Sequence, residues 1–290
     1  MKELILHIGT QKTGTTSIQE FLRLNRVALE KDGIFTPKSL DIGGGHHRWI
    51  TALASDINRN DAFTANLEFE SQEHKKNNLN TKLDNFATEV DKKDSGKWII
   101  SCEHMQSELK TTEEITRLKN LCEKFFNKIK IILYIRKPID TVISLWTTQL
   151  KYGAPLSRIS KPSNAFYENV CNHKNTICKW ESVFGRENIR VLKFQKKDFV
   201  KNDLIDDFCS HIGINIDNRY KIPDKKNESL SLIGMKSLGY INEFIPHFAK
   251  RTNESAILKR NRERLNLAAY IERFTSKGEK YKISKQENEE

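Results

Sequence analysis

Short apolar runs alternate along this chain with longer stretches in which apolar residues recur at helical spacing. The runs most typical of strands are residues 4–8, 97–101, 130–135 and 189–194, with a shorter one at 34–35. Strands that are apolar throughout are buried on both faces, as in parallel sheets covered by crossover helices. The alternation therefore predicts an α/β fold of the doubly wound type, in which helices flank a central parallel sheet.

The helical stretches have recognisable ends. After the first apolar run, apolar side chains recur three and four residues apart up to Gly33, which is a natural C-terminal stop. We therefore predict a helix over about 14–31. Pro138 suits the first turn of another helix, and the amphipathic segment 204–212 predicts a further one.

Length and composition are compatible with one large domain. With 290 residues, of which 37% are hydrophobic, the chain can bury a full core. We predict a single domain over residues 1–290. Within it, the stretch of about 52–96 is rich in Asn, Lys, Asp and Glu and predicts a polar helical insertion, and about 214–290 predicts a helical C-terminal part.

A basic surplus favours anionic ligands. The chain has 49 Lys and Arg residues against 38 Asp and Glu residues, which gives a formal charge of +11. This charge suits a nucleotide that carries several phosphates, and charge alone would equally suit nucleic acid or an acidic polysaccharide.

The cysteines and the first residues bear on the compartment. Five cysteines, an odd number without a CxxC pair, argue against a disulfide framework or a structural zinc. The first apolar stretch begins at Leu4 and is too short for a signal peptide, and no apolar run is long enough to cross a bilayer. We expect a cytoplasmic protein without a transmembrane segment, and work at a membrane surface stays open.

The first apolar run leads into a loop with the glycine spacing of a phosphate-binding loop. Gly9 and Gly14 keep the Walker spacing, but Thr15 occupies the position of the Walker lysine, and Lys12 precedes Gly14 by two residues. Backbone N–H groups over residues 13–16 at a helix N-terminus, with an ammonium group beside them, form a good anion site. An ordinary turn of small residues is the alternative, but such a turn does not require Lys-Thr-Gly-Thr-Thr.

Two other predicted strands end in polar side chains. Ligands of open parallel sheets bind beyond the carboxyl ends of the strands. The run 97–101 is followed by Glu103 and His104, and the run 130–135 by Arg136. Ser144 lies eight residues after Arg136 on the predicted helix, so a guanidinium fork and a hydroxyl could together bind one phosphate.

The loop at residues 11–16 and the Arg136–Ser144 pair are together similar to motifs of a known family. Gln-Lys-Thr-Gly-Thr-Thr resembles the 5′-phosphosulfate loop of sulfotransferases that use 3′-phosphoadenosine 5′-phosphosulfate (PAPS), especially the form in carbohydrate sulfotransferases. Arg136 and Ser144, around a Pro-x-Asp, resemble the 3′-phosphate motif of that family. The resemblance covers roughly residues 3–35 and 97–215. It implies a P-loop-like, three-layer α/β/α fold, a PAPS site, and sulfuryl transfer to a hydroxyl or amine.

The resemblance also implies roles for individual residues. The residues expected to bind the nucleotide are Gln11, Lys12, Thr13, Gly14, Thr15, Thr16, Arg136 and Ser144. Lys12 is expected to stabilise the leaving phosphate, and the spent nucleotide is adenosine 3′,5′-bisphosphate. This scheme requires no metal, and the sequence shows no convincing metal cluster.

A base is needed for the acceptor's proton. Glu103 is the first choice, since it follows a strand and should point into the same crevice. His104 is its neighbour, and cytosolic relatives use a histidine in this general region. Carbohydrate-directed relatives often place a glutamate shortly after the first helix, where this chain has only Asp41, His46 and His47. The base therefore stays open among Glu103, His104, His46 and His47.

We predict transfer of the PAPS sulfuryl group, by in-line displacement, to a hydroxyl of a carbohydrate, glycan or other small molecule, with no nucleic-acid partner. Two alternatives are kept. One is a P-loop kinase or NTPase that acts on a small metabolite, which Thr15 in the lysine position disfavours. The other is a non-catalytic protein that binds adenosine bisphosphate or polyanions with the same loop.

Overall fold

The computed structural model describes residues 1–290 except 155, 157–160, 225–229, 245–266, 276–278 and 281–290. The chain groups into two compact units. The first comprises Met1–Pro138 and Ser163–Asp224, and the second Ile139–Pro162 and Lys225–Glu290. The single domain over residues 1–290 stays a prediction.

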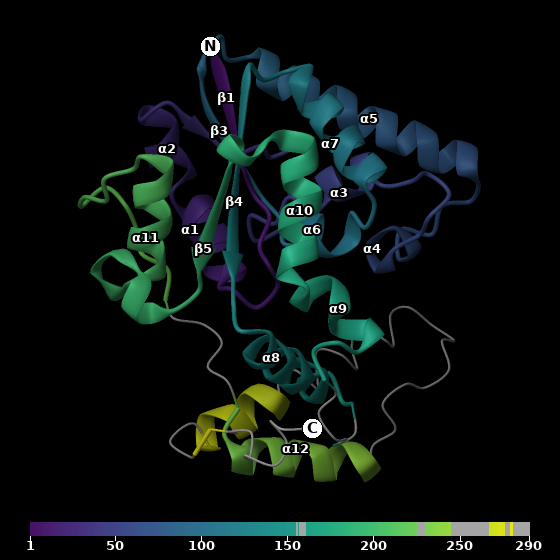
Figure 1. Ribbon diagram of the computed structural model, residues 1–290, viewed down its shortest axis with the longest axis vertical. Helices are drawn as coiled ribbons and strands as arrows, with labels where there is room; N and C mark the ends of the chain where they lie inside the picture. The colour runs from purple at the N-terminus through teal and green to yellow at the C-terminus, as the bar shows by residue number, and fades with distance from the viewer. Residues whose placement is uncertain (155, 157–160, 225–229, 245–266, 276–278, 281–290) are drawn as a thin grey trace. The chain divides into compact units, whose positions relative to one another are not determined.

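Five parallel strands form one sheet within the described part of the first unit (Figure 1). In chain order they are β1 (Lys2–His7), β2 (Ile34–Phe35), β3 (Gly96–Ser101), β4 (Lys128–Ile135) and β5 (Ile189–Lys193). Their order across the sheet is β2-β3-β1-β4-β5, and every neighbouring pair is parallel. The strands predicted from apolar runs are confirmed, and so is the α/β fold with a central parallel sheet.

Helices of the first unit cover both faces of this sheet (Figure 1). They are α1 (Thr15–Leu24), α2 (Arg26–Lys31), α3 (Trp49–Ala54), α4 (Ala62–Ala65), α5 (Gln72–Asp91), α6 (His104–Glu108), α7 (Thr112–Glu123), α9 (Ala165–Cys171), α10 (His173–Phe184) and α11 (Leu204–Ile212). Three short 3-10 helices are η1 (Arg186–Asn188), η2 (Lys196–Asp198) and η3 (Val200–Asn202). In Figure 1, α1, α2 and α11 lie on one side of the sheet, and α5, α7 and α10 lie on the other.

Side chains of the strands alternate between two apolar cores, one on each face. In β1, Leu4 and Leu6 belong to the core that contains Trp180 of α10, whereas Ile5 belongs to the core that contains Phe21 of α1. Strands β3 and β4 alternate in the same way. Both faces bury apolar area, which explains why these strands read as continuous apolar runs.

The helix predicted over 14–31 is two helices, because Asn25 interrupts it between α1 and α2. The Asn25 side chain donates to the carbonyl oxygens of Phe21 at 2.9 Å and Lys221 at 2.8 Å. It also accepts from the Lys221 N–H at 2.6 Å. A side-chain amide that bonds backbone groups competes with the helical ladder, so the buried Asn25 favours a break.

The region over 52–96, expected to form polar surface helices, contains α4 and the 20-residue α5. Helix α5 is mostly polar, with Leu79, Phe86 and Val90 among its few buried residues. No helix in the described part of the chain is long and apolar enough to cross a membrane.

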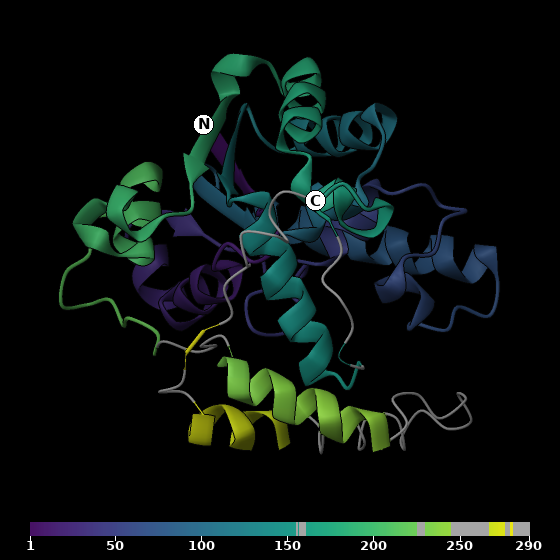
Figure 2. The ribbon, with the colours of Figure 1, turned by 60° about the horizontal axis from the view of Figure 1, so that its bottom comes forward.

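The second unit has its own small apolar core. Helix α8 (Pro138–Lys151) starts at the predicted proline, α12 spans Leu232–Phe244, and residues 267–275 are helical. Figure 2 shows α12 beside the helical stretch that follows it, and Met235 and Ala268 share a core with Leu150 of α8. Of the predicted helical part over 214–290, residues 225–229, 245–266, 276–278 and 281–290 lie outside the described residues.

Candidate functional site

The carboxyl ends of β1, β3 and β4 lie side by side, because these strands are parallel neighbours. His7, the last residue of β1, is paired with Ser101 in β3 and Ile132 in β4. The pairing continues past β1, where the Thr10 N–H donates to the Tyr134 carbonyl at 2.7 Å. Strand order reverses at β1, and open parallel sheets bind ligands at such a point. The loop after β1 therefore starts where a ligand is expected.

This loop ends at the N-terminus of α1. Lys12 has a left-handed backbone conformation (φ 64°), and Thr13 Oγ1 donates to the Thr10 carbonyl at 2.5 Å. Gly14 is the N-cap of α1 and has no side chain that could cap the first helical turn. The first N–H groups of a helix have no partner within it, so this end of α1 can bind an anion.

Arg136 follows β4 and contacts the loop. Its Nη1 donates to the Lys12 carbonyl oxygen at 3.2 Å, and its guanidinium carbon lies 5.7 Å from the centre of the Phe194 ring. The Arg136 carbonyl accepts from His173 Nε2 at 2.6 Å. These contacts hold the Arg136 cation beside the loop that carries the Lys12 cation.

Glu103 packs directly on the loop after β1. A Cβ atom on Gly9 would lie only 2.8 Å from Glu103 Cβ and 3.0 Å from Glu103 Cα. Gly9 also has φ 96°, a conformation that favours glycine. Only glycine allows the segments after β1 and β3 to approach this closely.

Two histidines and a glutamine surround the Glu103 carboxylate. Gln19 Nε2 of α1 donates to Glu103 Oε2 at 2.8 Å, and His46 Nε2 lies 3.7 Å from the same oxygen. The rings of His46 and His104 are 5.4 Å apart between centroids. Burial by itself raises the pKa of Glu103, but the positive charge that His46 and His104 carry when protonated and the bond from Gln19 outweigh it, so the net pKa is lowered. Glu103 is therefore ionised at neutral pH.

Three consecutive glycines bring His46 and His47 to this edge. A Cβ atom on Gly45 would collide with the carbonyl oxygen of Gln19, so the glycine segment packs against the backbone of α1. The His47 N–H donates to the Ser101 carbonyl at 3.2 Å, and the Ser101 N–H donates to His47 Nδ1 at 2.9 Å. This pair of bonds attaches the histidine segment to the end of β3.

The three histidines differ in what their rings can do. Burial lowers the pKa of His46, and it lowers the pKa values of His47 and His104 to about 4. All three rings are therefore neutral at neutral pH. His47 is fully buried and its Nδ1 already accepts from Ser101, so its proton is on Nε2. The His47 ring thus orients the segment, while His46 and His104 gather with Glu103.

The other predicted site residues have different surroundings. Gln11 Nε2 donates to Ser107 Oγ of α6 at 3.0 Å, which fastens the loop to the helix that begins after Glu103. Thr15 is buried, whereas Thr16 is exposed. Ser144 is half-buried on α8 in the second unit, and Arg136 is in the first, so their joint grip on a phosphate stays a prediction.

Gln19 and Phe194 belong to this edge but are absent from the sequence motifs. Gln19 was detectable as a polar side chain on the apolar face of α1, where it is only 5% exposed. Phe194 directly follows β5 and lies 3.1 Å from the position of a Cβ atom on Gly14. Inspecting every residue just past a strand, aromatic as well as polar, would have identified it.

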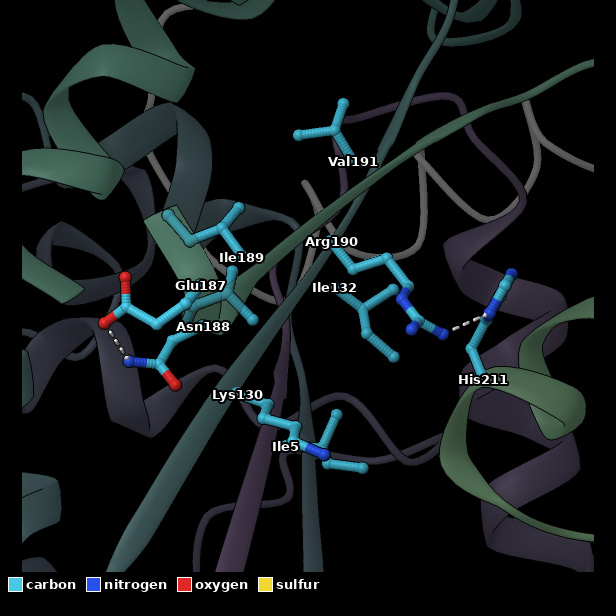
Figure 3. A pocket seen from close by; sticks show the side chains of 10 residues that line it. Ile5, Lys130, Ile132, Glu187, Asn188, Ile189, Arg190, Val191 and His211 are labelled. Atoms are coloured by element: carbon cyan, nitrogen blue, oxygen red, sulfur yellow. Dashed lines mark hydrogen bonds between the residues drawn. The ribbon is translucent and has the colours of Figure 1, made fainter. Parts of the chain in front are cut away.

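A separate hollow of about 480 Å³ lies over the first halves of β4 and β5 (Figure 3). Lys130 and Ile132 of β4, Arg190 and Val191 of β5, and His211 of α11 are among the residues that line it. Figure 3 shows Arg190 directed toward His211, with Nη1 donating to Nδ1 at 2.9 Å. None of the predicted site residues lines this hollow.

Solved sulfotransferase structures resemble this one at low sequence identity. The sulfotransferase from Alicyclobacillus acidocaldarius is 14% identical with a TM-score of 0.46, over 90% of this chain and 95% of that one. The sulfotransferase domain of the Synechococcus PCC 7002 olefin synthase is 14% identical with a TM-score of 0.42, over 93% of this chain and 95% of that one. No match was found among curated proteins.

The family comparison covers most of the chain. The sulfotransferase domain family matches residues 2–210, a span that includes all five strands and the loop after β1. It also includes Glu103 and Arg136. The chain belongs to the sulfotransferase family and is a transferase enzyme that moves sulfuryl groups.

Proposed function

We propose that this sulfotransferase takes its sulfuryl group from PAPS and transfers it to a hydroxyl of a carbohydrate or glycan. One observation carries the choice of donor: Arg136 Nη1 bonds the Lys12 carbonyl at 3.2 Å. That bond brings the cation after β4 to the loop whose helix N-terminus favours an anion. Two cations and a set of backbone N–H groups suit a nucleotide with phosphates at two positions.

The proposed reaction is an in-line displacement at sulfur. The acceptor oxygen forms a bond to sulfur while the bond from sulfur to the 5′-phosphate oxygen breaks. Negative charge grows on the leaving phosphate, and Lys12 with the N–H groups at the start of α1 stabilises it. Arg136, with Ser144 from α8, binds the 3′-phosphate. Neither of these two roles requires a metal.

Glu103 receives the acceptor's proton in this proposal. The carboxylate is ionised at neutral pH and so has a free site for a proton, although its lowered pKa makes it a weak base. The bond from Gln19 Nε2 at 2.8 Å orients the Glu103 carboxylate. The Cβ atom of Glu103 packs on Gly9 of the loop after β1, which we call the donor loop. His46 and His104 are the alternative bases, since both rings are neutral. His47 is the weakest candidate, because Ser101 already uses its Nδ1 lone pair.

The carbohydrate acceptor rests on the Gln-Lys-Thr-Gly-Thr-Thr loop and its resemblance to carbohydrate sulfotransferases. A panel of hydroxylated acceptors, including mono- and oligosaccharides, tests it with PAPS as donor. Sulfation of sugars in preference to phenols and amines is expected. Preference for a phenol or an amine would contradict this part of the proposal and leave the donor assignment intact.

The donor is tested by calorimetric titration with adenosine 3′,5′-bisphosphate, AMP and magnesium-ATP. We expect the bisphosphate to bind most tightly, and Arg136→Ala to weaken it about 10- to 100-fold, as expected for loss of a charge-assisted hydrogen bond. Arg190→Ala is the matched control, because Arg190 is an exposed arginine of β5 outside the site. Preference for magnesium-ATP, or equal affinity for the bisphosphate and AMP, would overturn the PAPS assignment.

The base is tested separately by Glu103→Gln. This change keeps the side-chain size and removes the proton acceptor, so turnover should fall by roughly 10²–10⁴-fold while bisphosphate affinity stays unchanged. Unchanged turnover would exclude Glu103, and the same assay on His104→Gln and His46→Gln would then identify the base. Binding of the bisphosphate without turnover of any acceptor in the panel would contradict the proposed acceptor class.

A further inference from the structure

His46, Glu103 and His104 converge from two segments that are far apart in the sequence. One potential ligand atom from each of the three lies within 4.8 Å of the others. All three residues are half-buried, so the cluster is partly shielded from solvent but an ion can still reach it. Two imidazoles and one carboxylate are the donor set that zinc and similar divalent ions prefer.

The spacing of one pair of donors is close to that of a metal site. His46 Nε2 and Glu103 Oε2 are 3.7 Å apart. Around a tetrahedral ion with ligands at about 2.0–2.1 Å, neighbouring ligand atoms are roughly 3.4 Å apart. This pair therefore needs to close by only a few tenths of an ångström, which small side-chain rotations can supply.

Two ring nitrogens at the cluster lack strong hydrogen bonds. His104 Nδ1 is buried and has no hydrogen-bond partner among the described residues. His46 Nε2 lies 3.4 Å from Cys102 Sγ, a weak partner, and 3.7 Å from Glu103. Buried polar atoms normally have partners, so these nitrogens call for an explanation that a bound ion would provide.

Residues around the cluster hold the proposed ligands in place, as residues next to the ligands do in metal sites. Gln19 Nε2 donates to Glu103 Oε2 at 2.8 Å and so orients the carboxylate. Packing of Gly45 on the backbone of α1 fixes the segment that carries His46. The nearby cation Arg48 opposes a metal ion, but it is itself neutralised by a buried ion pair with Asp61.

We propose that His46, Glu103 and His104 form a binding site for one divalent transition-metal ion of the zinc type. Three protein ligands leave at least one coordination position for water or another oxygen. Imidazole ligands select zinc, cobalt or nickel over magnesium and calcium. The site goes beyond the proposed function, and a bound ion would compete with the acceptor's proton for Glu103. His46 and Glu103 are 57 positions apart, which explains why no ligand spacing was visible in the sequence.

Titration of the full-length chain with Zn²⁺, in the absence of donor and acceptor, tests the site. The chain carries Cys178→Ser throughout, because Cys178 is an exposed thiol that could itself bind zinc. We expect one equivalent of Zn²⁺ to bind, and Co²⁺ at the same site to give the visible absorption bands of a low-coordinate ion. His46→Ala and His104→Ala should each weaken Zn²⁺ binding at least 10-fold.

Two controls make the result decisive. His74→Ala removes an exposed histidine of α5 that lies near Glu70, and it should leave Zn²⁺ affinity unchanged. Glu103→Gln keeps the side-chain shape and should weaken binding even if an alanine variant misfolds. Absence of stoichiometric binding by the parent chain would overturn the proposal. So would equal affinity in the parent, a folded histidine variant and Glu103→Gln.

Discussion

Two regions of one sheet carry cationic side chains but are built differently. At the carboxyl edge, Arg136 contacts a loop whose packing on Glu103 requires glycine at position 9. In the hollow over the first halves of β4 and β5, Lys130 is 48% exposed and pairs with Glu3 at 3.2 Å, and Arg190 bonds His211. The first region buries ionisable groups such as Glu103 and His47, whereas the cations of the second, Lys130 and Arg190, are exposed.

The difference supports placing the proposed site at the carboxyl edge. Glu103 is ionised and mostly buried, and His104 Nδ1 is buried without a partner in the described structure. Such arrangements oppose stability, so they persist where they serve a ligand or a reaction. The hollow of about 480 Å³ has cations of its own, but Lys130 and Arg190 there are paired. The presence of cations alone is therefore a poorer guide to a site than buried polar groups without partners.

The largest expected effect is on turnover, and it should differ between the lysines of the two regions. Lys12→Ala should lower turnover by about 10³-fold, because it removes a cation from the growing charge on the leaving phosphate. Affinity for adenosine 3′,5′-bisphosphate should fall much less. Lys130→Ala in the hollow should leave both quantities unchanged. Steady-state kinetics and calorimetry on the three proteins check this, and an equal loss in both lysine variants would remove the distinction.

The loss of stability at low pH should depend more on the buried histidine of the carboxyl edge than on the histidine of the hollow. His7, at the end of β1, is fully buried, and burial lowers its pKa from 6.5 to about 4. Between these values the unfolded chain binds a proton that the folded chain does not. The free energy of unfolding should therefore fall as the pH drops from 6.5 to 4. His7 should account for about 3 kcal/mol of this fall, and its contribution should not change below pH 4.

Urea denaturation at pH 7 and pH 4.5 measures this contribution. His7→Asn should reduce the loss of stability on acidification, although His47 and His104 still contribute. His211→Asn, in a half-buried histidine of the hollow, should reduce it much less. A larger effect from His211 than from His7 would contradict the comparison.

Gly9→Ala tests the close packing of the carboxyl edge. The added Cβ atom would meet the Glu103 backbone, and alanine disfavours φ 96°, so the free energy of unfolding should fall by about 2–3 kcal/mol. Gly33→Ala is the matched control, because Gly33 has φ 72° with nothing within 4 Å of the added atom. It should lose only about 1 kcal/mol, from backbone strain. Equal losses would mean that the contact with Glu103 adds nothing.

The smallest expected effect is in the hollow. Val191 is 37% exposed on β5, and Val191→Thr should change the free energy of unfolding by less than about 0.5 kcal/mol. Turnover should stay at the parental value. A loss of turnover would show that the hollow takes part in the reaction and would end the contrast between the two regions.

The fold was predictable because its strands are buried on both faces. Leu4, Ile5 and Leu6 face two different cores, so consecutive positions in the middle of β1 have to be apolar and the run is visible without context. The break at Asn25 was not predictable, since it depends on bonds to Lys221, almost 200 positions away. The spacing of apolar residues along the chain predicts which face of an element is buried. It does not predict which distant backbone group a polar side chain will bond.

The candidate site was predictable in part for the same reason. The loop at residues 11–16 and Arg136 follow strands directly, so strand prediction leads straight to them. The contact of Glu103 with Gln19 and His46 could not be predicted, because it joins three segments through long-range packing. The sequence left the base open among Glu103 and the histidines with Glu103 as the first choice, whereas the bond from Ser101 to His47 disfavours His47.

The contact between Gly9 and Glu103 has a consequence for how this enzyme can change. With the bond from Gln11 to Ser107, it makes the donor loop and the start of α6 a single rigid piece. If Glu103 is the base, the donor and the proton acceptor cannot be adjusted separately, because moving one displaces the other. Laboratory selection for a new acceptor should therefore accumulate substitutions away from this piece, and changes at Gly9 or Gln11 should be rejected whichever acceptor is selected.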